Sequence, residues 1–522
     1  MPTTAPPTRP ATSTPLVRVA YRPARDTLIT SGGFLTVSVA GAVSSLLLLL
    51  VVGAGPDTDA VVAGYSLFLV VSLFAATVRP VLVPAYGAVD PETAFRARVA
   101  DLGGRTGVVG VAAGGAVLVL TPLAVVLFAG TIQAASRGVL VTGLLLLAPA
   151  GWLQIRAAAG SSALAAVNRF TTSALAYAAA SLVAVGSTAV LLVAVGPLGL
   201  PAGALVGSVA LAAGHEAATR RLGLRLQESP RRLGQRTQWT FTRGLLVAAA
   251  VPLAWHAQLV VSLAFVSDVP GEVTAYAYGY YLVVAYLTAP ASASMVTLPR
   301  LVERLGGDRR GALSGYVATV TPPGLVLVSA LMAATVAFGE PVASSLLSGS
   351  LEPAQVTTLM DVILALSGMA VAQSLLLILW PTAAAMGRQG RLALVAVATL
   401  ALMAAGAALV RGHTAQVALV QSGASVLTTA GACVVLLGRA AGATVGRVAV
   451  RAVPALVCLG VVAGVRLLAG DGSGPAGAMA LAAGGLALSG LVCALLWPSM
   501  MAGVPVLGAL SRRSPFRRTG VA

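Results

Sequence analysis

Two arginines interrupt long apolar stretches of the sequence, in which charged side chains are otherwise rare. Arg79 and Arg156 each lie towards the end of such a stretch. A guanidinium group presents a planar fork of N–H donors that fits phosphate oxygens, so both residues are candidates for binding a phosphate or pyrophosphate group. The alternative is that both side chains only extend to the lipid headgroups at a membrane surface.

Two acidic residues and one histidine are further candidates, for coupling or gating. Asp59 begins an apolar stretch, where a carboxylate either caps the helix or lines a route through the protein. Asp361 lies about two turns inside another stretch, where a charge is costly unless it is paired or hydrated. His256 interrupts a third and would titrate in a proton-coupled cycle, or else it is satisfied by a neighbouring helix.

A dense group of tyrosines follows His256 along the chain. Its members are Tyr276, Tyr278, Tyr280, Tyr281 and Tyr286. The spacing of four puts Tyr276 and Tyr280 on one helical face, suited to stacking on a sugar or to lining a cavity. A belt at the membrane interface is the alternative for the outer members.

The composition requires a membrane around these residues. Of 522 residues, 57% are hydrophobic and 9% are charged, against about 25% charged in soluble domains. The apolar runs are continuous and long enough for helices, which excludes a transmembrane barrel of short alternating strands. The sequence predicts an all-α polytopic membrane protein with about 14 spans. They are 31–53, 60–86, 107–129, 138–160, 171–195, 198–218, 244–267, 274–299, 315–338, 355–385, 392–410, 414–438, 452–469 and 477–503.

The arginines predict the orientation of these spans. On one side of the membrane the loops and tails hold 28 arginines, whereas the opposite loops hold only Arg137 and Arg411. Because basic loops stay in the cytoplasm, we expect both termini there, in a multi-pass protein of the cell membrane. The arginines of these cytoplasmic loops then account for the net charge of +17, and no nucleic-acid partner is expected.

Weak internal repetition divides the chain. Segments 60–84 and 275–299 match at seven positions at an offset of 215, and a second match near 165–175 has an offset of 219. Duplication of a six-helix unit would place a substrate cavity between two parallel lobes. The expected organisation is a disordered cytoplasmic tail (1–30), an N-terminal lobe (31–218), a basic linker (219–243), a C-terminal lobe (244–438), an extra helix pair (439–503) and a basic tail (504–522).

Three segments resemble the MurJ lipid II flippases of the multidrug/oligosaccharidyl-lipid/polysaccharide (MOP) exporter superfamily. The turn Gly53-Ala54-Gly55 with its Thr58-Asp59-Ala60 helix entry is similar to the junction of their first two helices. Segment 166–170 resembles their fourth-to-fifth turn, and segment 276–301 resembles their eighth helix with its Leu-Pro exit. The resemblance implies the two-lobed fold and transport of a lipid-linked sugar.

The sequence departs from that family at its cavity arginines. The corresponding positions of the first helix hold Ser38 and Ser44, and those of the second and eighth helices fall near Ser72 and at Tyr280. Only Asp59 matches the family's set of charged residues. The departures put lipid II itself in question as the substrate.

Together these observations favour a flippase that moves a polyprenyl-pyrophosphate-linked sugar, such as lipid II or a related envelope precursor, by alternating access. Arg79, Arg156, Asp59, Tyr276 and Tyr280 are the expected substrate-binding residues. The expected partners are that substrate and membrane lipids. The alternatives are a cation-coupled exporter of drugs or metabolites, and a non-transporting scaffold that binds enzymes of cell-envelope synthesis.

No enzymatic activity, cofactor or metal is expected. The sequence has no nucleotide-binding or catalytic motif, and no loop is long enough for a catalytic domain. The three cysteines, Cys433, Cys458 and Cys493, lie inside apolar runs and form no metal-binding pattern. Uphill transport would therefore draw on an ion gradient, the membrane potential or a partner.

Overall fold

A computed structural model describes most of the chain. It covers residues 23–87, 92–226, 235–287, 290–291, 294, 309–347, 349–453 and 460. The predicted spans 452–469 and 477–503 and the tail 504–522 lie outside the described residues, apart from positions 452, 453 and 460.

Helices make up the described segments. The first half contains α1 (Pro23–Val52), α2 (Pro56–Gly87), α3 (Glu92–Leu127), α4 (Arg137–Ala166), α5 (Phe170–Val195) and α6 (Gly199–Arg221). The second half contains α7 (Gln235–Phe265), α8 (Glu272–Tyr286), α10 (Arg309–Leu346), α11 (Pro353–Ala365), α12 (Ser367–Ala385), α13 (Gln389–Leu409) and α14 (Thr414–Leu437).

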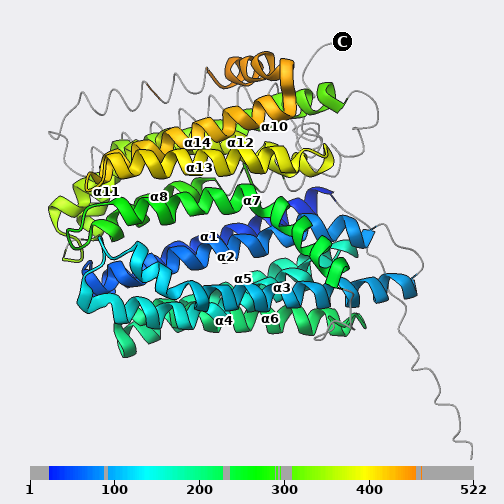
Figure 1. The fold of residues 1–522 in the computed structure, drawn as a ribbon, viewed down its shortest axis with the longest axis horizontal. Helices are drawn as coiled ribbons and strands as arrows, with labels where there is room; N and C mark the ends of the chain where they lie inside the picture. The colour runs from blue at the N-terminus through cyan, green and yellow to red at the C-terminus, as the bar shows by residue number, and fades with distance from the viewer. Residues whose placement is uncertain are drawn as a thin grey trace, which may run out of the picture.

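The two halves lie side by side (Figure 1). Helices α1 to α6 occupy one side of the molecule, and α10 to α14 occupy the other. Between them, α7 and α8 pack against α2, and α8 also contacts α1. The boundary between the halves therefore consists of the paired helices α1–α2 and α7–α8.

The surface has the polarity expected of a protein in lipid. Large apolar side chains point outwards, such as Leu409 at 88%, Val193 at 79% and Val119 at 78% exposure. Polar side chains such as Gln421 and Ser425 are fully buried. By length and composition, eight helical stretches of the described chain can cross a membrane, or nine with the α11–α12 pair, which is bent by 44°. The chain is an all-helical multi-pass membrane protein, as its apolar runs predict.

The helix bounds differ from the predicted spans in two informative places. Helix α1 starts at Pro23, so the last eight residues of the predicted disordered tail 1–30 are helical. The predicted span 355–385 is broken at Leu366 into α11 and α12. An apolar run reports the length of a span but not a bend within it, because both halves of a bent span are equally apolar.

Small residues let α5 and α6 approach closely. A Cβ atom built on Gly203 of α6 would lie 2.0 Å from Oγ1 of Thr188 and 2.8 Å from its backbone. Only glycine fits at this position. Gly203 thus has a packing role, as small residues have in other membrane helix pairs.

Candidate functional site

Asp59, in the first turn of α2, bonds to the other half of the molecule. Its Oδ2 accepts a hydrogen bond from the backbone N–H of Gly271 (2.7 Å), and its Oδ1 accepts one from the backbone N–H of Thr274 (2.9 Å) and one from the Thr274 hydroxyl. The side chain is 3% exposed. Asp59 therefore caps the N-terminus of α8, a role that a residue just before the helix usually fills.

The same end of the molecule carries further contacts between the halves. The backbone N–H of Ala54 donates to the carbonyl of Ser350 (3.0 Å), and the Tyr278 hydroxyl donates to the carbonyl of Ser45. Gly53 permits the turn that brings Ala54 to Ser350, since its φ of +83° lies in the left-handed region that favours glycine. We call these two contacts, together with the hydrogen bonds of Asp59 to Gly271 and Thr274, the α1–α2-end closure.

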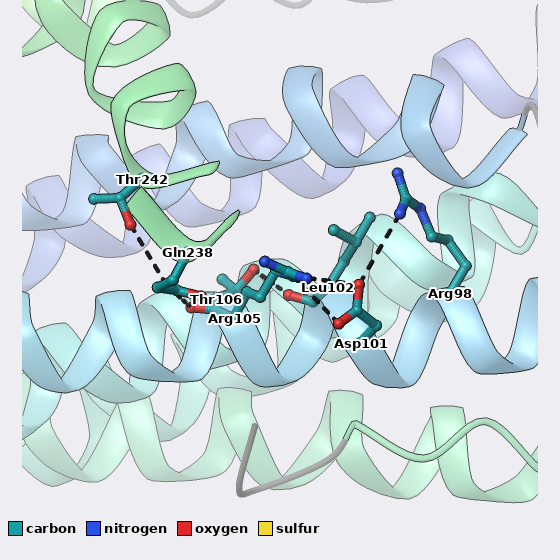
Figure 2. A network of polar contacts seen from close by, with 7 residues as sticks. All are labelled: Arg98, Asp101, Leu102, Arg105, Thr106, Gln238 and Thr242. Atoms are coloured by element: carbon teal, nitrogen blue, oxygen red, sulfur yellow. Dashed lines mark hydrogen bonds and ion pairs between the residues drawn. The ribbon is translucent and has the colours of Figure 1, made fainter. Parts of the chain in front are cut away.

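A second connection joins the halves towards the opposite end. There α3 begins, and Nε of the buried Arg105 donates to the carboxylate of Asp101 (3.2 Å; Figure 2). The side-chain amide of Gln238, in the first turn of α7, donates to the backbone carbonyl of Arg105 (3.3 Å). The same amide lies 3.4 Å from the Thr242 hydroxyl. Contacts near both ends of the bundle thus connect the halves.

Arg79, on α2, points into the first half of the molecule. Its guanidinium carbon lies 5.8 Å from the centre of the Phe170 ring on α5, a cation–π arrangement. It is also close enough to Tyr177 and His215 to interact with them electrostatically. Among the described residues, no carboxylate forms an ion pair with Arg79.

A chain of hydrogen bonds lies beside Arg79. The hydroxyls of Ser161 and Ser173 are 2.9 Å apart, and Ser173 lies 3.1 Å from Nε2 of His215. The other ring nitrogen of His215 lies 3.0 Å from the carbonyl of Leu211, so both nitrogens of the imidazole are within hydrogen-bonding distance of a partner. The surroundings of Arg79 are thus aromatic and neutral polar groups.

Arg156 has different surroundings. It lines a pocket between α3 and α4, and its Nη2 lies 3.5 Å from Oε2 of Glu216 on α6. The other oxygen of Glu216 lies 2.8 Å from Nε of Arg220. The structure therefore places the two predicted arginines in separate environments, Arg79 against α5 and Arg156 beside a carboxylate.

The two predicted tyrosines also differ. Tyr276 is fully buried and donates to Oε1 of Gln421 on α14 (2.5 Å), which also accepts from Ser262. Tyr280 is equally buried, but its hydroxyl has no partner. Tyr276 is thus fixed within the second half, whereas Tyr280 has an unused donor.

His256 belongs to the same cluster as Tyr280. Its ring centre lies 6.1 Å from that of Tyr280 and 5.0 Å from that of Trp255, in edge-on contacts. Four buried polar atoms here have no hydrogen-bond partner: Nε1 of Trp255, Nδ1 of His256 and the hydroxyls of Tyr280 and Tyr281. Buried polar groups are normally paired, so this group, which we call the aromatic cluster, is suited to binding a polar ligand or water.

Asp361 is exposed on α11. Its position inside an apolar run predicts a buried charge, and this burial is not observed. The described residues also contain no group of three or more His, Cys, Asp or Glu side chains that could hold a metal.

A buried network of neutral polar groups was not anticipated from the sequence. Ser425 of α14 donates to Gln258 of α7 (3.0 Å) and lies 3.3 Å from the amide nitrogen of Gln373 on α12. The available signal was the spacing of Gln421, Ser425 and Thr429 on one face of an apolar helix. This network connects α7, α12 and α14.

Comparison with known proteins identifies the fold. No family model matches the chain, and no curated protein matches its sequence. Among solved structures, lipid II flippase MurJ in an inward closed conformation aligns with a TM-score of 0.66 at 12% identity, covering 91% of this chain and 99% of that one. An inward-facing multidrug resistance MATE family transporter of the MOP superfamily gives 0.58 at 14% identity, covering 81% and 99%.

A third structure shows the same architecture. A MOP superfamily transporter from Pyrococcus furiosus, whose binding pocket has a reversed polarity that suggests a different function, aligns with a TM-score of 0.51 at 12% identity. The alignment covers 86% of this chain and 99% of that one. Three solved structures at 12 to 14% identity thus share the arrangement of helices described above.

Proposed function

We propose that this chain, which has the fold of the MOP superfamily transporters, is a flippase for a polyprenyl-pyrophosphate-linked sugar of the cell envelope, lipid II or a related precursor. The observation that carries the proposal is Arg79, a guanidinium inside a membrane span whose described surroundings are Phe170, Tyr177 and His215. The similarity to the fold of MurJ supports it.

A cation inside a membrane needs a partner. Moving an arginine to the centre of a bilayer is costly, so such residues face a cavity or mark the path of a substrate. No described carboxylate pairs with Arg79. A pyrophosphate would provide acceptors in the geometry that the guanidinium fork fits, with more charge than a single phosphate.

The α1–α2-end closure fits an alternating-access cycle. The arginine distribution predicts that this end faces the outside of the cell, with both termini in the cytoplasm. In such a cycle the halves separate at one end while they meet at the other. Asp59 would then hold the outer end closed while the lipid-linked sugar enters from the inner leaflet, near Arg79.

A cation-coupled exporter fits the described residues less well. Such a protein needs buried carboxylates for its substrate or coupling ion. Of the acidic side chains that the structure describes, only Asp59 is buried, and its oxygens are occupied by Gly271 and Thr274. Asp361, the other predicted candidate, is exposed.

The test is leaflet-resolved labelling of lipid-linked precursors in cells depleted of this protein. We expect one precursor to accumulate in the inner leaflet and to be exported again when the wild-type protein is supplied; Arg79→Lys, which keeps the charge but not the planar fork, should restore export only in part. Arg79→Gln should fail to restore export at equal protein abundance, and Arg391→Gln, at an exposed arginine of α13, should restore it. An unchanged distribution of every precursor would contradict the proposal and favour the scaffold or the exporter.

A further inference from the structure

The lipid-facing side of the first half carries a cavity that has no role in the proposed transport route. It is a half-open hollow between α3 and α4 with a volume of about 510 Å³, and it is lined mainly by small and apolar residues. The lining residues are Gly103, Gly107, Val108, Val111, Ala112, Trp152, Arg156, Ala159 and Leu226. We call it the α3–α4 pocket. Its volume lies within the range of pockets that bind small molecules.

The α3–α4 pocket opens towards lipid. Val111 in its wall is 61% exposed and Val108 is 37% exposed. The neighbouring outward residue Val119 on α3 is 78% exposed. Exposed valines on a membrane helix contact acyl chains, so the occupant of the pocket enters from the bilayer.

Glycines of α3 form the hollow. A Cβ atom on Gly107 would meet nothing within 4 Å, so the space beside this residue is empty. At Gly103 a Cβ would lie 2.9 Å from Cδ2 of Leu226, and this leucine, just after α6, closes the end of the pocket. The hollow therefore lies at the end of the helices from which the basic linker leaves α6, at the level of the headgroups.

The polar side of the pocket is positively charged. Arg156 and Arg220 share Glu216, at 3.5 Å and 2.8 Å, so these three side chains carry two positive charges and one negative charge. Trp152 precedes Arg156 by one helical turn and lies on the same face. Tryptophan is typical of the interface between acyl chains and headgroups. A phosphate can thus bond Arg156 while an acyl chain fills the apolar hollow.

We propose that the α3–α4 pocket binds an anionic phospholipid of the inner leaflet as a resident ligand. Basic pockets between membrane helices on the cytoplasmic side recognise anionic headgroups in this way. The phosphate contacts Arg156, in competition with Glu216, and one acyl chain lies along Gly107 and Val111. This role for Arg156 is independent of whether the protein transports a lipid-linked sugar.

Trp152 provides a direct probe of the occupant. A variant that keeps Trp152 and has phenylalanine at the other four tryptophans is reconstituted in bilayers containing lipids with brominated acyl chains, which quench nearby tryptophan. Brominated phosphatidylglycerol should quench Trp152 with an affinity about fivefold higher than brominated phosphatidylcholine, the preference that one arginine near a headgroup provides. Equal quenching by the two lipids would overturn the proposal.

Three substitutions separate the effect of the charges of Arg156 and Glu216 on lipid binding from the effect of the shape of the pocket. Arg156→Gln should abolish the preference for phosphatidylglycerol, whereas Glu216→Gln should increase it, because a competing carboxylate is removed. A merely structural role of the Arg156–Glu216 pair predicts loss of folded protein in both variants and no increase in either. Gly107→Leu should fill the hollow and reduce quenching by both lipids. Arg391→Gln, at an exposed arginine of α13, is the matched control and should leave the preference unchanged.

A second measurement covers the case in which the single-tryptophan protein does not fold. Native mass spectrometry of the otherwise wild-type chain counts retained phosphatidylglycerol and phosphatidylcholine, and Arg156→Gln should lower only the former. A preference that persists in Arg156→Gln would overturn the proposal. Displacement of phosphatidylglycerol from Trp152 by equimolar polyprenyl pyrophosphate would also overturn it and would assign the pocket to the transported lipid.

Discussion

Asp59 and Thr274 join the two halves of the molecule through two hydrogen bonds, one to the backbone N–H and one to the hydroxyl of Thr274. They are 215 residues apart, which is the offset at which the segments 60–84 and 275–299 match. The start of one helix therefore bonds to the start of its counterpart. This bond lies at the centre of the α1–α2-end closure.

Removing the Asp59 carboxylate should open this end. We expect Asp59→Ala to weaken the closure by about 2 kcal/mol, because buried N–H groups of α8 lose a charged acceptor. The measurement is the rate at which a disulfide forms between positions 54 and 350 in a chain that carries Ala54→Cys and Ser350→Cys and lacks its native cysteines. Asp59→Ala should lower this rate. Asp57→Ala is the control, since Asp57 lies in the same turn but is exposed. An unchanged rate in Asp59→Ala would show that other contacts hold the end closed.

The Thr274 hydroxyl should act through Asp59. Thr274→Val keeps the shape of the side chain but loses the donor, and the backbone bond to Asp59 remains. We expect a cost of about 1 kcal/mol, half that of Asp59→Ala. In a double-mutant cycle the two substitutions should cost less together than the sum of their separate effects, because they break the same bond. Strict additivity of the two costs would contradict a direct interaction.

Two tyrosines of α8 should respond differently to loss of their hydroxyls. Tyr276→Phe leaves Gln421 without one of its donors and should lower thermal stability by about 1 kcal/mol. Tyr280→Phe removes a buried hydroxyl that has no partner and should leave stability unchanged or slightly raise it. Both effects are measured by thermal unfolding of the purified protein in detergent.

In transport, Tyr280→Phe should have a larger effect than Tyr276→Phe, the opposite of their order in stability. If the aromatic cluster binds a polar group of the substrate, Tyr280→Phe impairs export of the precursor although the protein is stable, whereas Tyr276→Phe impairs it only through stability. Both variants are compared in the depleted cells at equal protein abundance. Normal export by Tyr280→Phe would remove this hydroxyl from the substrate-binding residues.

The packing of α5 on α6 should tolerate no side chain at Gly203. Gly203→Val would place atoms against the backbone of Thr188 and should destabilise the first half by about 3 kcal/mol, at the upper end of overpacking costs. Gly186→Ala, on α5 with nothing within 4 Å of its Cβ, should be neutral or stabilising. Thermal unfolding of the two variants distinguishes a close contact from a general sensitivity of glycine positions.

The sequence predicts the helices because apolar length is a local property. The predicted spans 138–160 and 171–195 correspond to α4 (Arg137–Ala166) and α5 (Phe170–Val195). The extensions of helices beyond the bilayer are not apolar, so α3 and α10 begin well before the runs that predicted them. The bend at Leu366 is not visible in the apolarity of the run, but Ser367 and Gly368 follow it directly, and such a pair is a common site of helix kinks.

The candidate site is predicted less completely, because it depends on which helices meet. The sequence indicates that Asp59 caps a helix or lines a route, but not that its partner is α8. Arg79 and Arg156 have the same pattern, an arginine near the end of an apolar run, yet one faces an aromatic ring and the other a carboxylate. The direction in which each side chain points follows from tertiary packing, which residue spacing within one helix does not contain.

The bond between Asp59 and Thr274 also has a consequence for how such a molecule can originate. Two aspartates at these positions would repel each other, and two threonines would leave the amides of α8 without a charged acceptor. A symmetric dimer of either half would therefore lack this bond between a carboxylate and a hydroxyl, because the bond requires different residues at the two positions. A single chain can hold Asp59 at one of them and Thr274 at the other.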